Sequence, residues 1–354
     1  MIFMEKKRIE YLDAMRGFTM LLVVYSHIQY FSYHNVSLPW NQVFILFRMP
    51  LFFFASGFIF YNAERIWDKT ESISFLKKKF MVQIAPTAIF LSIYAYMFDI
   101  NLPICLCTPP KAGYWFTLSL FEYFFIYVVF ISLFRKVSAR NQELALMLCA
   151  LTLYFFSGKY GRNMLQEIIS EHTIGVLGIA QLRYFIFFAF GILVRQNWKY
   201  FQAMTCHGKA IGCVLALFFT DIIFIRPNIP ATLPQAQWLL FIVDGLLGIV
   251  IVFTFFRKYE SSFTKETLPG RSLQYIGRRT LDIYLLHFFF LPRNLEEIGR
   301  FFAESHNEVI ELCISLSLSL IVIGTCLIIS NVLRLSPTLA YILFGVKRKE
   351  QPST

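Results

Sequence analysis

The chain has 354 residues, of which 57% are apolar and 16% are charged, and it contains 41 Phe and 18 Tyr. A soluble core of this size does not need apolar runs along the whole chain, so the composition excludes a soluble protein and predicts a polytopic membrane protein. The formal net charge of +11 would suit a nucleic-acid-binding protein, but the positions of the Lys and Arg residues indicate membrane topology instead.

We expect an all-α transmembrane helix bundle of ten spans, with both termini in the cytoplasm. The predicted spans cover residues 12–33, 40–61, 80–98, 114–134, 144–157, 178–194, 210–225, 236–256, 280–299 and 309–333. The fifth span is short, and the ninth has an apolar half followed by charged residues. In this topology 24 of the 33 Lys and Arg residues lie in inner segments, three lie in spans, and six are assigned to the outer side, a count that includes Arg293 in the charged end of the ninth span, as the positive-inside rule requires. The basic balance therefore needs no nucleic-acid partner.

The N-terminal segment has the basic start and apolar run of a secretory signal, but it carries charges in the run and lacks a small-residue cleavage site. We therefore expect a retained first helix. The sequence shows no short internal repeat and no loop long enough for a separate domain, so residues 1–354 are predicted to form one integral membrane domain with no appended soluble domain. The seven cysteines have no metal-ligand spacing, and no metal site is predicted.

Ionisable residues in the first span are the strongest sign of chemistry. Asp13, Arg16 and His27 lie in an apolar run that is long enough to cross a bilayer. Ionisable groups at membrane depth are costly, so they persist mainly where they face a protein interior or a wet cavity. Residues eleven apart on a helix return to nearly the same azimuth, so Arg16 and His27 share a face at a separation of roughly 16 Å. Asp13 lies about one turn before Arg16, and we expect all three side chains to point into one cavity.

Five stretches resemble one known family, in the same order along the chain. The most specific is YLDAMRGFTMLLVVYSH at residues 11–27, in which a basic residue is followed after ten residues by a histidine. The others are FRMPLFFFASGFIF (47–60), YWFTLSLFEY (114–123), RYFIFFAFGILVR (183–195) and GRRTLDIYLLHFFF (277–290). Together they resemble the membrane acyltransferase-3 family, the integral membrane O-acyltransferases that modify surface glycans. Arg48 is a departure, because histidine is expected as readily at that position.

The resemblance implies a multi-pass enzyme, in the bacterial inner (cytoplasmic) membrane, that moves an acyl group to a hydroxyl. The implied donor is cytoplasmic acyl-CoA, with acetyl-CoA as the expected co-substrate, and no cofactor is expected to stay bound. The implied acceptor is a cell-surface or lipid-linked glycan, and membrane lipid surrounds the bundle. The acyl group, the particular glycan and the oligomeric state stay open.

The first span supplies the predicted catalytic residues. His27 is the predicted general base, since histidine has an unperturbed pKa near 6.5 and takes a proton from a hydroxyl at neutral pH. The alternative is a hydrogen-bonded histidine that only ties helices together. Arg16 presents a planar fork of donors that suits a phosphate or carboxylate at the cytoplasmic side. Its alternatives are snorkelling to the interface and pairing with Asp13, which is predicted to orient it.

Predicted substrate contacts lie on two further spans. Arg48 lies about 12 Å along its span, two residues before Pro50, which removes a helical hydrogen bond and opens a polar niche. The alternative for Arg48 is a structural ion pair. Trp115 either stacks on a sugar or belongs to the interfacial aromatic belt. Glu122, about 10 Å further in, is the stronger candidate because a buried carboxylate needs a partner.

The penultimate span supplies the last candidates. His287 lies about 10 Å into this span, where it is either a substrate contact in the donor tunnel or a histidine that packs between helices. Arg278 and Arg279 directly precede the span. They are either positive-inside anchors or ligands for the phosphates of a cytoplasmic nucleotide.

Two other classes of protein remain as alternatives. A transporter or flippase for an anionic lipid-linked glycan would also need buried Arg residues and aromatic side chains, and a ligand-sensing receptor is the third class. Inverted hydropathy repeats or paired broken helices in the two halves would favour transport, and the sequence shows neither clearly. We therefore expect an acyltransferase.

Overall fold

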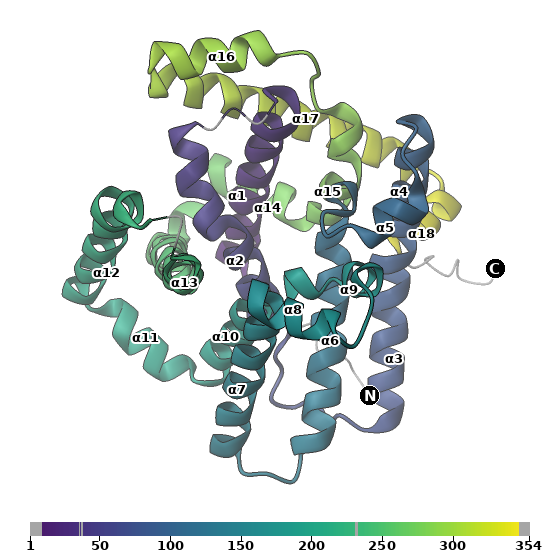
Figure 1. Ribbon diagram of the computed structural model, residues 1–354, viewed down its shortest axis with the longest axis vertical. Coiled ribbons are helices and arrows are strands. Elements are labelled where there is room, and N and C mark those ends of the chain that lie inside the picture. The colour runs from purple at the N-terminus through teal and green to yellow at the C-terminus, as the bar shows by residue number, and fades with distance from the viewer. Residues whose placement is uncertain (1–8, 35, 37, 231–232, 347–354) are drawn as a thin grey trace. The chain divides into compact units, whose positions relative to one another are not determined.

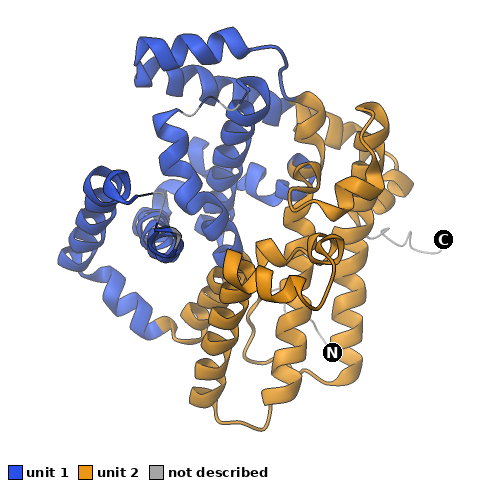
Figure 2. Ribbon diagram, in the orientation of Figure 1, with its two compact units in different colours: residues 1–55, 199–283, 291–324 blue, residues 56–198, 284–290, 325–354 orange. Residues whose placement is uncertain are grey.

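The computed structural model describes residues 9–34, 36, 38–230 and 233–346. All regular elements in these ranges are helices, joined by short π-helical and 3-10 turns (Figure 1). The predicted all-α class is therefore confirmed. The chain divides into two compact units, each built from three separate segments (Figure 2). Unit 1 covers residues 1–55, 199–283 and 291–324, and unit 2 covers residues 56–198, 284–290 and 325–354.

Unit 1 combines the N-terminal helix with helices from the second half of the chain. Its helices are α1 (Glu10–His27), most of α2 (Pro39–Phe60), α11 (Trp198–Cys206), α12 (Gly208–Thr220), α13 (Pro234–Lys258), α14 (Leu268–Arg278), α16 (Glu296–Ser305) and the first part of α17 (Glu308–Leu333). π-Helical turns follow α1 at Ile28–Ser32 and α12 at Asp221–Ile225.

Unit 2 holds the middle of the chain together with two later segments. Its helices are α3 (Lys69–Lys79), α4 (Ala85–Met97), α5 (Leu102–Cys107), α6 (Trp115–Phe134), α7 (Ala139–Ser157), α8 (Lys159–Gln166), α9 (Glu171–Val176), α10 (Phe185–Gln196), most of α15 (Thr280–Phe290) and α18 (Pro337–Phe344). A π-helical turn at Phe80–Ile84 joins α3 to α4, and 3-10 turns at Lys111–Gly113 and Ile179–Tyr184 precede α6 and α10.

Within the described ranges, seven helical segments are long and apolar enough to cross a membrane, and an eighth arises if α7 and α8 form one bent span. The predicted count of ten spans and the side of each terminus stay predictions. The predicted fifth span, residues 144–157, belongs to a longer helix, because α7 already begins at Ala139. After Gly158 the chain bends by 75° into α8.

The ninth predicted span, residues 280–299, is not one continuous helix. Helix α15 ends at Phe290, and the chain is not helical again until α16 begins at Glu296. Pro292 explains the break, because the residue before a proline is disfavoured in the helical conformation. Leu291 is accordingly extended, with φ −61° and ψ 129°.

The first helix packs closely against α14 in unit 1, and the two helices lie side by side in Figure 1. A Cβ on Gly17 would lie 2.0 Å from the carbonyl oxygen of Leu273, and a Cβ on Gly277 would lie 1.8 Å from the carbonyl oxygen of Asp13. Only glycine allows the two backbones to approach this closely. The crossing therefore brings the end of α14 beside the half of α1 that carries Asp13 and Arg16.

Local sequence features at both ends of α14 set its position. Thr267 caps the helix, since its Oγ1 accepts a hydrogen bond from the Gly270 N–H at 3.1 Å, and Pro269 occupies the first turn. The helix ends at Arg278, and Arg279 leaves the helical conformation, with φ −108° and ψ 16°, before α15 begins. Arg278 and Arg279 therefore lie at a break between two helices.

Unit 2 has an aromatic core around the end of α2. The centroid of the Phe60 ring lies 5.0 Å from that of Phe124 and 5.8 Å from that of Phe188. The backbones also approach closely, because a Cβ on Gly57 would lie 2.1 Å from the carbonyl oxygen of Phe188. Phe124 and Phe188 contact each other with their centroids 5.5 Å apart, which packs α6, the helix that carries Glu122, against α10.

Candidate active site

A carboxylate near the start of α1 holds two guanidinium groups. Asp13 is 8% exposed. Its Oδ1 lies 3.6 Å from Arg16 Nη1, and its Oδ2 lies 3.3 Å from Arg278 Nε. Arg16 Nη2 also donates a hydrogen bond to Thr280 Oγ1 at 2.8 Å. Asp13 and Thr280 therefore fix the direction of the Arg16 guanidinium group.

The start of α15 adds a further ion pair, which involves a second carboxylate. Arg279 Nη1 lies 2.9 Å from Asp282 Oδ2, and Asp282 is 2% exposed. The side chains of Arg16, Arg278 and Arg279 are between 22% and 42% exposed, whereas both carboxylates are buried. With three guanidinium groups and two carboxylates the cluster has a net charge of +1, and exposed guanidinium donors suit phosphate or carboxylate ligands. We call these five residues the arginine cluster.

His27 lies at the other end of the same helix. It is the last residue of α1 and is partly buried. Its ring packs edge-on against Phe31, with the two centroids 5.8 Å apart. Because α1 is uninterrupted between Arg16 and His27, the two residues lie roughly 16 Å apart along the axis. The next turn, Ile28–Ser32, is π-helical, a feature that is frequent at functional sites.

A buried carboxylate on α17 organises the backbone around His27. Glu311 is 1% exposed and accepts hydrogen bonds from Tyr25 Oη at 2.7 and 2.9 Å and from Gln29 Nε2 at 2.8 Å. A third side chain, Ser315, donates a further hydrogen bond to Glu311 from its Oγ at 2.9 Å. Tyr25 and Gln29 flank His27 in the sequence, so Glu311 holds the end of α1 and the π-helical turn in place.

Glu311 is not among the site residues that the sequence predicts. The predicted tenth span begins at Val309, and a carboxylate so near the end of a span is ordinarily assigned to the membrane interface. The available signal is that Glu311 lies two residues inside an otherwise apolar run that continues to Leu333. A carboxylate inside such a run needs a buried partner.

Arg48 lies on α2 in a partly buried position, and the helix continues through Pro50 to Phe60. Its neighbour Phe47 packs tightly on α13, because a Cβ on Gly248 would lie 2.3 Å from Phe47 Cβ. Within unit 1, α2 therefore packs closely against α13 beside Arg48.

In unit 2, Glu122 lies against a glycine with a left-handed backbone. A Cβ on Gly178, which has φ +61°, would lie 3.2 Å from both carboxylate oxygens of Glu122. Among the residues that the structure describes, Glu122 Oε2 has no hydrogen-bond partner. Lys111 lies close enough to interact with this carboxylate electrostatically. Glu122 therefore keeps hydrogen-bonding capacity that no described side chain uses.

Lys111 is itself buried, at 3% exposure. Its Nζ donates hydrogen bonds to the carbonyl oxygens of Leu106 at 2.8 Å and Gly175 at 2.7 Å. Burial lowers the pKa of the Lys111 ammonium from its usual value, and the nearby Glu122 carboxylate partly opposes this shift. Lys111 therefore crosslinks the loop before α6 to α9.

The turn that contains Lys111 has an unusual backbone. Lys111, Ala112 and Gly113 have φ values of 46°, 51° and 93°. Such conformations cost free energy in non-glycine residues and persist where the surrounding structure enforces them. Here Tyr284 Oη donates a hydrogen bond to the Gly113 carbonyl oxygen at 2.9 Å, and Phe288 leaves no room for a side chain at Gly113.

His287 and Trp115 both lie in aromatic surroundings in unit 2. His287 is fully buried, its Nδ1 donates a hydrogen bond to the Tyr284 carbonyl oxygen at 2.9 Å, and its ring centroid lies 3.9 Å from that of Phe288. Trp115 stacks on Tyr184, with the centroids 5.4 Å apart and the planes at 21°. These contacts are the ones expected if His287 only packs between helices.

A small cavity of about 200 Å³ lies in unit 2, and its wall includes Gly178, the glycine against which Glu122 packs. Arg162 Nε and Gln181 Oε1, on two lining residues, have no hydrogen-bond partner within the described ranges. Gln181 is 8% exposed, and its Nε2 donates to the Pro109 carbonyl oxygen at 3.0 Å. The cavity therefore offers one donor and one acceptor to a small polar group. We call it the polar cavity.

Apolar helices of spanning length, which carry Arg48 and Glu122 in partly buried positions and Glu311 in a buried one, define the class of the protein, an integral, multi-pass membrane protein with internal polar sites. A family model described as an acyltransferase domain, that of the acyltransferase-3 family, matches residues 9–331. The chain belongs to this family and is a membrane acyltransferase that transfers groups other than aminoacyl groups. The resemblance seen in the sequence is thus confirmed. No curated protein and no solved structure matches the chain.

Proposed function

We propose that the protein transfers an acetyl group from cytoplasmic acetyl-CoA to a hydroxyl of a cell-surface or lipid-linked glycan in the bacterial inner membrane. One observation carries this proposal. The arginine cluster lies at one end of α1, and His27 lies at the other end. A single helix thereby offers a site for phosphates and, roughly 16 Å away, a proton acceptor.

The arginine cluster suits the nucleotide end of CoA. Guanidinium groups bind phosphates through paired, charge-assisted hydrogen bonds, and Arg16 is held in direction by Asp13 and Thr280. Arg278 and Arg279, at the break between α14 and α15, add two further positive charges to this site. The pantetheine arm of CoA is long and flexible, so it would run beside α1 and deliver the thioester toward His27.

His27 is the proposed general base. It would take the proton from the acceptor hydroxyl while the hydroxyl oxygen attacks the thioester carbonyl carbon. The new C–O bond forms, the C–S bond breaks, and the CoA sulfur leaves with the proton that His27 returns. The Glu311 network supports this role by holding Tyr25 and Gln29 on either side of His27.

The substrate contacts proposed from the sequence are Arg48, Trp115, Glu122 and His287. Glu122 is the best supported, because its Oε2 has no hydrogen-bond partner within the described ranges and its carboxylate packs against Gly178, a residue in the wall of the polar cavity. A carboxylate accepts hydrogen bonds from sugar hydroxyls, and the cavity adds Arg162 and Gln181. His287 has weaker support, since it is fully buried among aromatic rings.

The test is transfer of label. Purified protein in detergent is incubated with acetyl-CoA labelled in the acetyl group and with total bacterial membrane glycolipids. The proposal expects label in a base-labile ester on a glycolipid and one free CoA thiol for each ester formed. Release of CoA with no label in any glycolipid would overturn the glycan acceptor. Absence of both products, with glycolipid crossing the bilayer of reconstituted vesicles, would favour a flippase.

A further inference from the structure

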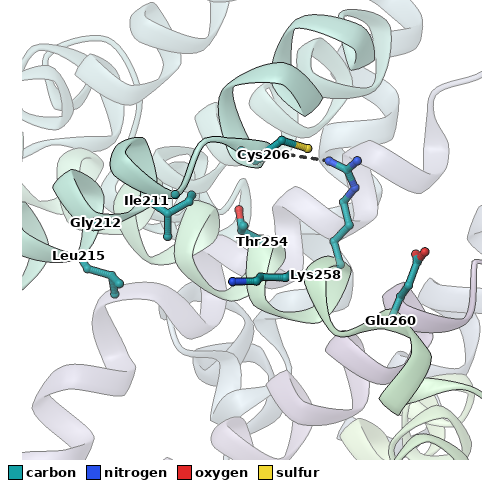
Figure 3. Close-up of a pocket in the computed structure, with 10 residues that line it drawn as sticks. Cys206, Ile211, Gly212, Leu215, Thr254, Lys258 and Glu260 are labelled. Carbon is teal, nitrogen blue, oxygen red and sulfur yellow. Dashed lines mark hydrogen bonds between the residues drawn. The ribbon is translucent and has the colours of Figure 1, made fainter.

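A second, larger cavity lies wholly within unit 1, between α12 and the end of α13 (Figure 3). Its volume is about 460 Å³. Helix α12 contributes Ile211, Gly212 and Leu215 to its wall, and helix α13 contributes Thr254, Arg257 and Lys258. One wall is therefore apolar, and the other carries a hydroxyl and two positive charges.

The apolar wall belongs to a helix that the rest of the protein hardly covers. Only 11% of the α12 span is buried, against 44% of the α13 span. A Cβ on Gly208 or Gly212 would meet nothing within 4 Å, so the backbone of α12 stays accessible there. In a membrane, such an uncovered apolar helix faces lipid, and the cavity adjoins it.

The polar wall has a hydroxyl that the protein leaves unused. Thr254 is 7% exposed, and its Oγ1 has no hydrogen-bond partner among the described residues. A buried polar atom of this kind normally finds a partner, so the cavity is expected to hold one. Thr254 can donate a hydrogen bond to an anion from this position.

The two cations differ in their contacts and in their exposure. Arg257 Nη1 donates to Thr205 Oγ1 at 3.3 Å, which ties α13 to α11. Lys258 is exposed, and its side chain extends toward the α12 wall in Figure 3. Glu260 also lines the cavity, so its charged groups sum to +1. Arg257 therefore closes the end of the cavity, and Lys258, whose Nζ also lies 5.6 Å from the centroid of the Tyr259 ring, is the exposed cation beside it.

From this arrangement we infer that the cavity binds the phosphate headgroup of an anionic phospholipid, with an acyl chain along the uncovered face of α12. Basic pockets between membrane helices on the cytoplasmic side bind such headgroups, and the end of α13 lies on that side in the predicted topology. A free phosphate or the phosphates of CoA would use the same cations and hydroxyl, but neither would use the apolar wall next to the bilayer. The inference does not depend on the proposed acetyl transfer.

The test measures binding of phosphatidylglycerol to the purified full-length protein in neutral detergent, by native mass spectrometry and by titration with a fluorescent phosphatidylglycerol. Lys258→Gln is expected to weaken binding about fivefold, the usual effect of one cation near an anionic headgroup. Thr254→Val, which removes only the hydroxyl, is expected to weaken it about threefold. Lys265→Gln changes an exposed cation outside the cavity and is the matched control, with less than about a twofold change.

Two further arms identify the source of the phosphate. Phosphatidylcholine should bind at least about tenfold more weakly than phosphatidylglycerol, and neither inorganic phosphate nor CoA should displace the bound lipid. Equal losses in Lys258→Gln and Lys265→Gln would overturn the site in favour of general surface charge. Displacement by CoA or inorganic phosphate would overturn the lipid as occupant. Because binding is measured without turnover, neither result bears on acetyl transfer.

Discussion

Asp13 and Glu311 in unit 1 differ from Glu122 in unit 2 in how their carboxylates are satisfied. In unit 1, Asp13 pairs with two guanidinium groups, and Glu311 accepts hydrogen bonds from three side chains. In unit 2, Glu122 lies against Gly178, and its Oε2 has no hydrogen-bond partner in the part of the chain that the structure describes. A satisfied carboxylate fixes its neighbours, whereas an unsatisfied one is available to a ligand. Asp13 and Glu311 are therefore expected to position their neighbours, and Glu122 is expected to contact a ligand.

The largest expected effect on stability is at Glu311. Glu311→Ala leaves the hydroxyl of Tyr25 and the amide of Gln29 without their buried acceptor, so we expect a loss of about 3 kcal/mol in the free energy of unfolding. Thermal unfolding in detergent measures it. Glu308→Ala, at an exposed position three residues earlier on α17, is the matched control and should change little. Equal losses in the two variants would show that Glu311 does not organise this region.

The next effect concerns the buried cation of unit 2. Lys111→Met removes the donor to two carbonyl oxygens, and we expect a loss of about 2 kcal/mol, with Lys159→Met at an exposed site as the control. The lowered pKa of Lys111 means that the unfolded chain binds more protons at alkaline pH. Stability should therefore rise with pH between the lowered pKa and the usual value of 10.5, and Lys111→Met should lack this rise. An identical pH dependence in the variant would contradict the burial argument.

Arg16 tests the arginine cluster. Arg16→Lys keeps the charge but loses the planar fork, so we expect acetyl-CoA to bind about tenfold more weakly while the protein still folds. Isothermal titration or competition with labelled CoA gives the dissociation constant. Arg135→Lys, at an exposed position after α6, is the control. An unchanged affinity would return Arg16 to a purely structural role.

The smallest expected effect is at Glu122, and it distinguishes most directly between ligand contact and a positioning role. Glu122→Gln keeps the shape of the side chain but removes its charge, so we expect stability to change by less than about 1 kcal/mol and the KM for the acceptor to rise about fivefold. Glu167→Gln, at an exposed position after α8, serves as the control. A large loss of stability with an unchanged KM would place Glu122 with the positioning carboxylates of unit 1.

Asp13, Arg16 and His27 lie on one uninterrupted helix, as the sequence predicts, and helical periodicity alone gives their spacing along it. That their side chains share one cavity stays a prediction. The same reasoning found the all-α class and most spans, since long apolar runs have few alternative structures. It failed at residues 280–299, where Pro292 ends the helix although the hydropathy continues beyond it.

Contacts between distant segments were not accessible in this way. The sequence named Arg278 and Arg279 only as candidates, and their approach to Asp13 depends on the close crossing at Gly17 and Gly277. The sequence does not indicate that two glycines so far apart in the chain lie at one helix crossing. The partners of Glu311 and the two carbonyl acceptors of Lys111 are likewise set by packing that no local pattern records.

The central claim is that His27 takes the proton from the acceptor hydroxyl. The most direct measurement is the rate of acetyl transfer by His27→Gln at saturating acetyl-CoA, with acetyl-CoA binding measured on the same preparation and His287→Ala as the comparison. Loss of a positioned base lowers the rate by about 10²- to 10⁴-fold, so His27→Gln should bind acetyl-CoA normally and transfer almost nothing, while His287→Ala should be impaired less. Retention by His27→Gln of more than about a tenth of the wild-type rate would contradict the assignment.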